Sequence, residues 1–234
     1  MLRTAHFTLA GLLALTGQYV HYQPNTGAAS GPTFTHIQSC ANQNSGGVGT
    51  ATCTLGSAIG AGHLLEVCLS NANGGPLTLT WSGDSGTFTS DITNYQYSNG
   101  GNTFMFSCYH VLSTGGGGTT ISCTDSGSSL FFPAITVDEW SFTGGPITVD
   151  QTDAGNKATS GAPASNSVTT TANGDLIVGY ASYNGGVGAG SGFTAGGNSV
   201  FPSLQEYQVQ TTAGAITATF TGSTSWGAHV VAFK

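Results

Sequence analysis

The sequence predicts an all-β protein: an antiparallel β-sandwich or jelly-roll-like domain preceded by an extended N-terminal arm. Short alternating apolar segments recur about every 8 to 15 residues, separated by clusters of Gly, Asn, Ser and Pro, and helical periodicity is nearly absent. Only 6% of the 234 residues are charged, yet 38% are hydrophobic. Such a composition favours a packed β core over a disordered chain.

The expected strands follow one another along the whole chain after residue 33. Each is rich in Thr, Val, Ile or aromatic residues and ends at a turn-forming cluster. We expect strands at 33–40, 49–55, 63–70, 76–81, 85–90, 94–98, 102–112, 119–124, 134–142, 166–171, 175–183, 203–212, 215–222 and 225–233. The segments 150–164 and 183–197 are expected to be long surface loops. The resulting organisation is an arm over residues 1–33 and a single β-sandwich domain over residues 34–234.

One segment is echoed later in the chain. GHLLEVCLSNANGG at 62–75 is similar to GDLIVGYASYNGG at 174–186, and each follows a Thr-rich strand. The echo predicts two similar halves that contribute to two sheets.

Several motifs resemble those of secreted bacterial Gly/Thr-rich β-sandwich modules. They are G-x-L-[LI]-x-V after a Thr-rich strand, TTTANGDLIVG, then GSGF, EYQ and a closing W-x-A-x-x-V-A-F-K, together covering roughly residues 34 to 234. These motifs are structural, so the resemblance implies fold and export and assigns no activity. In organisation, an apolar arm ahead of a sandwich also resembles the subunits of donor-strand pili and related extracellular filaments.

The five cysteines indicate an oxidising compartment. Cys40 and Cys53 are symmetric about a Gly-Gly pair, and Cys108 and Cys123 about a Gly-rich turn. If each segment is a hairpin, each pair lies directly across the ladder, so we expect the disulfides Cys40–Cys53 and Cys108–Cys123. Cys68 is then expected to be a buried thiol. Two disulfides favour an extracellular or cell-surface location.

Charge and hydropathy limit the partners. The chain has three basic residues and a net charge of −7, whereas nucleic-acid binding requires a basic patch. No apolar run approaches the length of a membrane span. No N-x-[ST] sequon occurs, so an attached glycan would be O-linked or attached in another way.

No catalytic motif has its required context. Gly83-Asp84-Ser85-Gly86 matches the nucleophile motif of chymotrypsin-type proteases. The candidate base that precedes it, His63, is too close to Ser85 in the sequence for such a protease. The four residues also suit a turn between two strands. The carboxylates that could serve a glycosidase lie singly in separate expected strands and not as a pair. Those that could bind Ca²⁺ lack the regular D-x-[DN]-x-[DN]-G spacing of calcium ligands. We therefore expect no enzyme, no cofactor and no metal. The carboxylates in question are Glu66, Asp138, Glu139 and Glu206 for the glycosidase, and Asp150 and Asp153 for Ca²⁺.

Sugar binding is the main alternative function. Tyr95 and Tyr97 lie at i and i+2 in one expected strand, beside Ser98-Asn99-Gly100-Gly101. Alternation places both rings on one face, where they are candidate glycan contacts of a carbohydrate-binding or adhesive module.

The arm suggests the primary function. Residues 1–17 also read as a signal peptide, with Arg3 as a weak basic region and an indifferent cleavage site. If the arm is retained, its apolar side chains need a partner surface, and an apolar strand added to a neighbour's sheet edge supplies one. We therefore expect a homopolymeric extracellular filament subunit that joins head to tail. The expected arm contacts are Phe7, Leu9, Leu12, Leu13, Leu15, Tyr19 and Val20.

Overall fold

The protein is all-β, as predicted. The computed structural model describes residues 31–72, 75–127, 130–197, 200 and 202–234. Within these residues the chain forms twenty strands and no helix. Every strand pairing is antiparallel, and the strands are distributed over six sheets.

The N-terminal half forms one sandwich. Its larger sheet, here called the N sheet, has the order β1 (Thr33–Gln43), β10 (Ala134–Thr143), β4 (Leu64–Ala72), β7 (Asn102–Leu112), β6 (Thr89–Asn99). A smaller sheet covers its outer face, in the order β3 (Thr50–Thr54), β8 (Gly117–Asp125), β5 (Leu79–Asp84). A short ribbon pairs β2 (Gly47–Val48) with β9 (Leu130–Phe131).

The C-terminal half forms a second sandwich. Its larger sheet, the C sheet, has the order β11 (Val149–Thr152), β20 (Ser225–Phe233), β14 (Asp175–Asn184), β17 (Ser203–Gln210), β16 (Thr194–Ala195), and β12 (Asn156–Ala158) also pairs with β20. Two ribbons cover it: β13 (Val168–Thr169) with β18 (Ala215–Ile216), and β15 (Val187–Ala189) with β19 (Phe220–Gly222).

The two halves repeat one strand order. Taken in chain order, β1, β4, β6, β7 and β10 occupy the positions in the N sheet that β11, β14, β16, β17 and β20 occupy in the C sheet. The echoed segments are the two central strands, β4 and β14. Leu64 and Leu176 match within the echo, and both side chains belong to the same buried cluster. The prediction of two similar halves is therefore confirmed.

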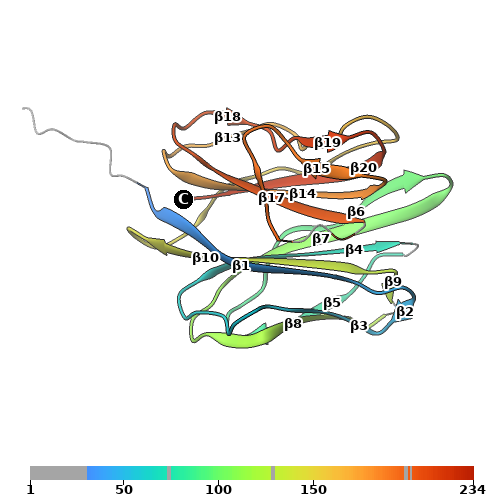
Figure 1. Cartoon of the computed structure of the whole chain (residues 1–234), viewed down its shortest axis with the longest axis horizontal. Coiled ribbons are helices and arrows are strands. Elements are labelled where there is room, and N and C mark those ends of the chain that lie inside the picture. Colours follow the sequence, from blue (N-terminus) through green and yellow to red (C-terminus); the bar gives the residue numbers. More distant parts are fainter. Residues whose placement is uncertain (1–30, 73–74, 128–129, 198–199, 201) are drawn as a thin grey trace, which may run out of the picture.

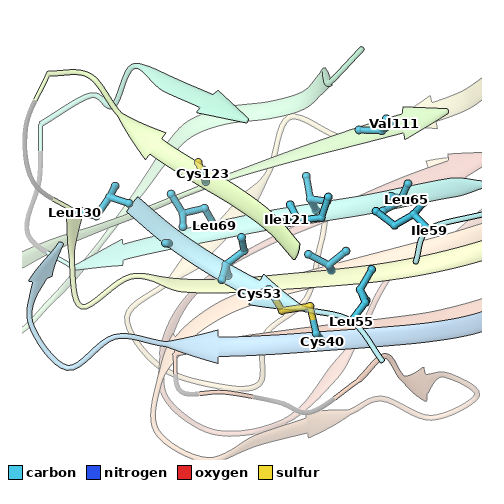
Figure 2. Packing of buried hydrophobic residues seen from close by; sticks show 14 of the residues in the cluster. Cys40, Cys53, Leu55, Ile59, Leu65, Leu69, Val111, Ile121, Cys123 and Leu130 are labelled. Atoms are coloured by element: carbon cyan, nitrogen blue, oxygen red, sulfur yellow. A yellow bond between two sulfur atoms is a disulfide. The ribbon is translucent and has the colours of Figure 1, made fainter. Parts of the chain in front are cut away.

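The sheets stack as four layers, with the N and C sheets inside (Figure 1). Alternation along β4 sends Leu65, Val67 and Leu69 into the outer N-terminal core (Figure 2). The alternate positions face the C sheet, where Leu64 packs with Leu176. Strands β4, β10, β14 and β20 are consequently buried on both faces. This burial explains the consecutive apolar residues of β4, β14 and β20, whereas β10 also buries Asp138 and Glu139.

The disulfide prediction is half right. Cys40 is bonded to Cys53, as expected, but β1 pairs with β10 and β3 with β8, so the bond joins two sheets and not the arms of a hairpin (Figure 2). Cys108 is bonded to Cys68, and Cys123 is a buried free cysteine. The predicted pair Cys108–Cys123 is therefore wrong, and so is the free thiol at Cys68.

The cause of the error is a crossover after β7. The chain leaves the N sheet there, and β8 pairs with β3 and β5 in the smaller sheet. Cys123 then faces the outer N-terminal core, while Cys108 faces the C sheet beside Tyr180. Cys68 and Cys108 are direct partners in the β4–β7 ladder, with a Cα–Cα distance of 4.1 Å. Burial raises the pKa of the Cys123 thiol, which keeps it protonated and unreactive.

The two expected loops contain edge strands. The segment 150–164 carries most of β11 and all of β12, and 183–197 carries β15 and β16. These strands are only two to four residues long, too short for period-two alternation to be recognised.

Candidate binding cleft

A cleft of about 270 Å³ lies at one end of the molecule, where the N and C sheets meet. The ends of β1, β4 and β14, the start of β7, and the residues before β17 and after β9 bring its lining together. None of the described residues that line the cleft is charged. They are Gln43, Ala72, Asn102, Phe104, Phe132, Asn184 and Pro202.

The two aromatic walls differ in exposure. Phe104 is nearly buried and stacks on Tyr97 with ring centroids 5.3 Å apart. Phe132 is 43% exposed and has a φ of 45°, in the left-handed region. Its amide donates a hydrogen bond of 3.1 Å to the carbonyl of Gly46. A bulky residue held at positive φ costs roughly 1–3 kcal/mol, and such strain clusters at binding sites.

The sequence reasoning missed this cleft. The sequence signal of the cleft is the doublet Phe131-Phe132 before Pro133, where two exposed aromatic residues follow a Ser-rich segment. The other lining residues come from the ends of five separate strands, which no local pattern brings together.

The predicted glycan contacts do not form an exposed platform. Tyr97 is 2% exposed, and its hydroxyl lies 3.1 Å from Ser182 Oγ in the C sheet. Tyr95 is half-buried, packs on Phe106 and lies under the ammonium of Lys157. The two rings do share one face of β6, as predicted, but that face packs against the C sheet.

The candidate glycosidase carboxylates are buried and not on outward faces. Glu66, Asp138, Glu139 and Glu206 are at most 2% exposed. Glu66 and Asp138 are partners in the β4–β10 ladder and face the C sheet. Burial raises the pKa of Glu66, and Asp91 and Asp138 raise it further. A substrate cannot reach this pair without separating the two sandwiches.

Glu66, Cys68 and Cys108 lie close enough together to suggest metal ligands. Cys68 and Cys108 form a disulfide, so neither offers a thiolate to an ion.

The four histidines that the structure describes are each bonded to a carboxylate. Ser85 Oγ contacts none of these four rings in the hydrogen bonds of the described residues, because its partners are the Gly116 carbonyl and the Gly115 amide. The pairs are His36–Asp138 at 2.8 Å, His63–Glu139 at 2.5 Å, His110–Asp91 at 2.7 Å and His229–Asp153 at 2.6 Å.

In the Gly83-Asp84-Ser85-Gly86 motif, the first two residues end β5 and the last two form the bend after it, so the expected turn is confirmed for the second half of the motif. A Cβ on Gly83, whose φ is 112°, would lie 2.1 Å from the carbonyl oxygen of Thr120. Gly86 donates to Asp84 Oδ1 at 2.6 Å, and Ser85 Oγ donates to the carbonyl of Gly116 at 3.1 Å. The residue types of the motif are thus explained by backbone packing.

The two candidate Ca²⁺ carboxylates serve separate clusters. Asp153 Oδ1 accepts from the amide of Val230 at 3.0 Å and contacts His229. Asp150 instead contacts Thr171 and Lys234. Both are bonded to protein groups, so the expectation of a solvated loop is wrong for this pair.

Glu206 is expected to make stability depend on pH. Its side chain is fully buried in the C-terminal half, where burial raises its pKa to about 8 despite hydrogen bonds from backbone amides. The pKa of Glu206 is higher in the folded protein than in the unfolded chain. Its contribution to the free energy of unfolding is therefore complete below about pH 4.5 and is lost as the pH rises through about 8. Glu206→Gln should therefore remove roughly 2–4 kcal/mol of the stability loss between pH 5 and pH 8.

Urea denaturation of the wild type and of Glu206→Gln at both pH values measures this effect. The variant is expected to be the more stable protein at pH 8. Equal pH slopes in the two proteins would contradict the assignment.

The predicted arm contacts, Phe7 to Val20, lie outside the described residues. No helix among the residues that the structure describes is long and apolar enough to cross a membrane. Neither a protein-family model, a curated protein nor a solved structure shows significant similarity to this chain.

Proposed function

We propose that the protein is a structural subunit of an extracellular polymer, in which the N-terminal arm of one copy lies in the cleft of the next. The observation that carries the proposal is the cleft between the N and C sheets, whose described lining is uncharged and partly apolar. The cleft lies at the end of the molecule away from the start of β1. The two disulfides fit an oxidising compartment.

The cleft and the arm are chemically matched. Phe104, Phe132 and Pro202 offer apolar surface, and three amide side chains offer donors and acceptors for an extended backbone. Arg3 is the only charged residue among the first thirty. Leucines and aromatic residues of the arm would gain about 1.5–3 kcal/mol for each side chain that becomes fully buried.

The geometry favours a head-to-tail contact. Strand β1 runs from Thr33 to Gln43, which lines the cleft, so the arm joins the sandwich at the far end of this strand (Figure 1). Eleven strand residues separate the two points by roughly 35 Å. Thirty extended residues reach about 100 Å, which is enough to enter a neighbour's cleft. Because donor and acceptor surfaces differ, the contact can propagate.

A neutral sugar is the second candidate occupant. Aromatic faces and amide groups without charge also suit a hexose ring. The cleft is near the lower end of the volumes that ligand sites occupy, about 300–1,000 Å³. On this alternative the protein is a carbohydrate-binding or adhesive module.

Phe132→Asn tests the cleft. Asparagine tolerates the left-handed φ of this position, so the fold should be as stable or more so, while the exposed aromatic wall is lost. Self-assembly of the full chain, followed by light scattering and electron microscopy, should fall at least tenfold. Phe131→Asn is the matched control, because Phe131 has the same exposure, 44%, and does not line the cleft.

The outcomes separate the two occupants. Normal assembly by Phe132→Asn, or single particles in wild-type material that retains residue 1, would overturn the polymer proposal. Loss of binding to a neutral-glycan array in the same variant, without any effect on assembly, would favour the sugar.

A further inference from the structure

A lysine and two carboxyl groups meet on three adjacent strands of the C sheet. Lys234 directly follows β20, Asp150 lies in β11, and Asp175 begins β14. Strand β20 pairs with both neighbours at Phe233, opposite Val149 and Leu176. Thr148 and Lys234 exchange two backbone hydrogen bonds of 2.8 and 2.9 Å. The backbone therefore places the three residues at neighbouring positions of adjacent strands.

The lysine nitrogen and the Asp150 carboxylate are in direct contact. Lys234 Nζ lies 2.5 Å from Asp150 Oδ1 and 2.7 Å from Thr171 Oγ1. Thr171 holds the carboxylate from the other side, with its amide 2.6 Å from Oδ2 and its hydroxyl 2.5 Å from Oδ1. The carbon Cγ is one bond beyond Oδ1, so the lysine nitrogen and the carbon that it would attack are close neighbours.

The site excludes water from the carboxyl groups. The Asp150 side chain is 1% exposed and Asp175 is fully buried, while the Lys234 side chain is 38% exposed. Burial and the neighbouring Asp150 raise the pKa of Asp175 to about 7. Burial also raises the pKa of Asp150, but hydrogen bonds from Lys234 and Thr171 outweigh it and the pKa falls to about 2. Near neutral pH, the Asp175 carboxyl is thus about half protonated, and the neighbouring Asp150 carboxylate is hydrogen-bonded to the amine.

We propose that Lys234 and Asp150 condense to an intramolecular isopeptide bond, with Asp175 as the catalytic proton donor. Lys234 first gives one proton to an oxygen of the Asp150 carboxylate, which leaves a neutral amine with a lone pair. The amine nitrogen attacks Cγ of Asp150 while Asp175 gives its proton to the same oxygen, and the nitrogen then gives a second proton to Asp175. The C–O bond breaks, and that oxygen leaves as water. An ammonium and a carboxylate become an amide and water, with no change in oxidation state and no other reactant.

Fixed positions favour this condensation. Well-oriented intramolecular reactions reach effective concentrations of about 10⁵–10⁸ M, which no free amine and acid attain in water. An ordinary salt bridge between Lys234 and Asp150 is the competing state. The amide would tie edge strand β11 to β20 covalently. The proposal does not depend on polymer formation.

Mass spectrometry of the full chain decides between the two states. After incubation of the folded protein at pH 7, then denaturation and reduction, the intact mass should be lower than the sequence mass by one water molecule. Fragmentation should locate a branched peptide that joins Asp150 to Lys234. The full sequence mass with no branched peptide would overturn the proposal.

Three variants test the roles of the residues. Lys234→Arg and Asp175→Asn should keep the full sequence mass, with folding checked by circular dichroism. Asp150→Asn should lose ammonia in place of water and reach the same final mass as the wild-type product, because both give the same amide. A water-sized mass loss that persists in Lys234→Arg would place the reaction elsewhere and contradict the assignment.

Discussion

If the chain polymerises as proposed, each junction is expected to weaken by roughly a hundredfold or more when Leu12 and Leu13 are both replaced by aspartate. On that proposal the change places charges where apolar side chains would enter the neighbour's cleft, and an unpaired buried charge costs several kcal/mol even after relaxation. The concentration at which fibres appear, measured by light scattering and microscopy, reports the effect. Deletion of residues 1–22 should abolish assembly and leave the sandwich folded, because both disulfides lie after residue 33.

Two controls separate a docking arm from a signal peptide. Thr4→Asp with Thr8→Asp adds the same charge at polar positions of the arm and should weaken assembly far less. A free peptide of residues 1–22 should occupy clefts and shorten growing fibres. Fibres whose subunits begin at residue 17 or later would contradict the long-arm proposal and leave at most a short strand from Gln18 to Gln23.

The second large effect concerns the disulfide between Cys68 and Cys108. Replacing both residues with alanine should lower the free energy of unfolding by about 4 kcal/mol, because the bond closes a 40-residue separation in the unfolded chain. The same change at Cys40 and Cys53, which are 13 residues apart, should cost about 3 kcal/mol. Urea denaturation without reductant measures both losses.

Cys123→Ala is the matched control, since Cys123 is buried but forms no disulfide. It should cost only the packing of one sulfur atom. Peptide mapping without reduction should recover Cys40–Cys53 and Cys68–Cys108. A loss of crosslinking in Cys123→Ala would show that the pairing in solution differs from the structure.

The sequence by itself determined the fold class and the position of most strands. Alternating Thr-rich and apolar segments such as 102–112 and 134–142 coincide closely with β7 and β10. Period-two alternation is a property of the chain segment alone, so it can be recognised without knowing the neighbours. The echo of 62–75 in 174–186 likewise predicted two similar halves, because equivalent positions in two similar sheets demand similar side chains; that the echoed segments are the central strands β4 and β14 came from the structure.

Only the tertiary structure decided which strands are neighbours and what covers each face. The crossover after β7 sent Cys123 to another sheet and left Cys108 opposite Cys68. Stacking of the N sheet on the C sheet buried Tyr97 and Glu66, which an isolated sandwich would expose on its outer face.

The cleft and the Lys234 cluster were equally beyond the reach of the sequence. Phe132 and Asn184 line the same cleft, and Lys234 lies beside Asp150 and Asp175. In each case the residues are at strand ends 52 to 84 residues apart in the chain. Local patterns record whether a position prefers burial. They do not record the partner, because register and sheet order depend on the packing of the whole chain.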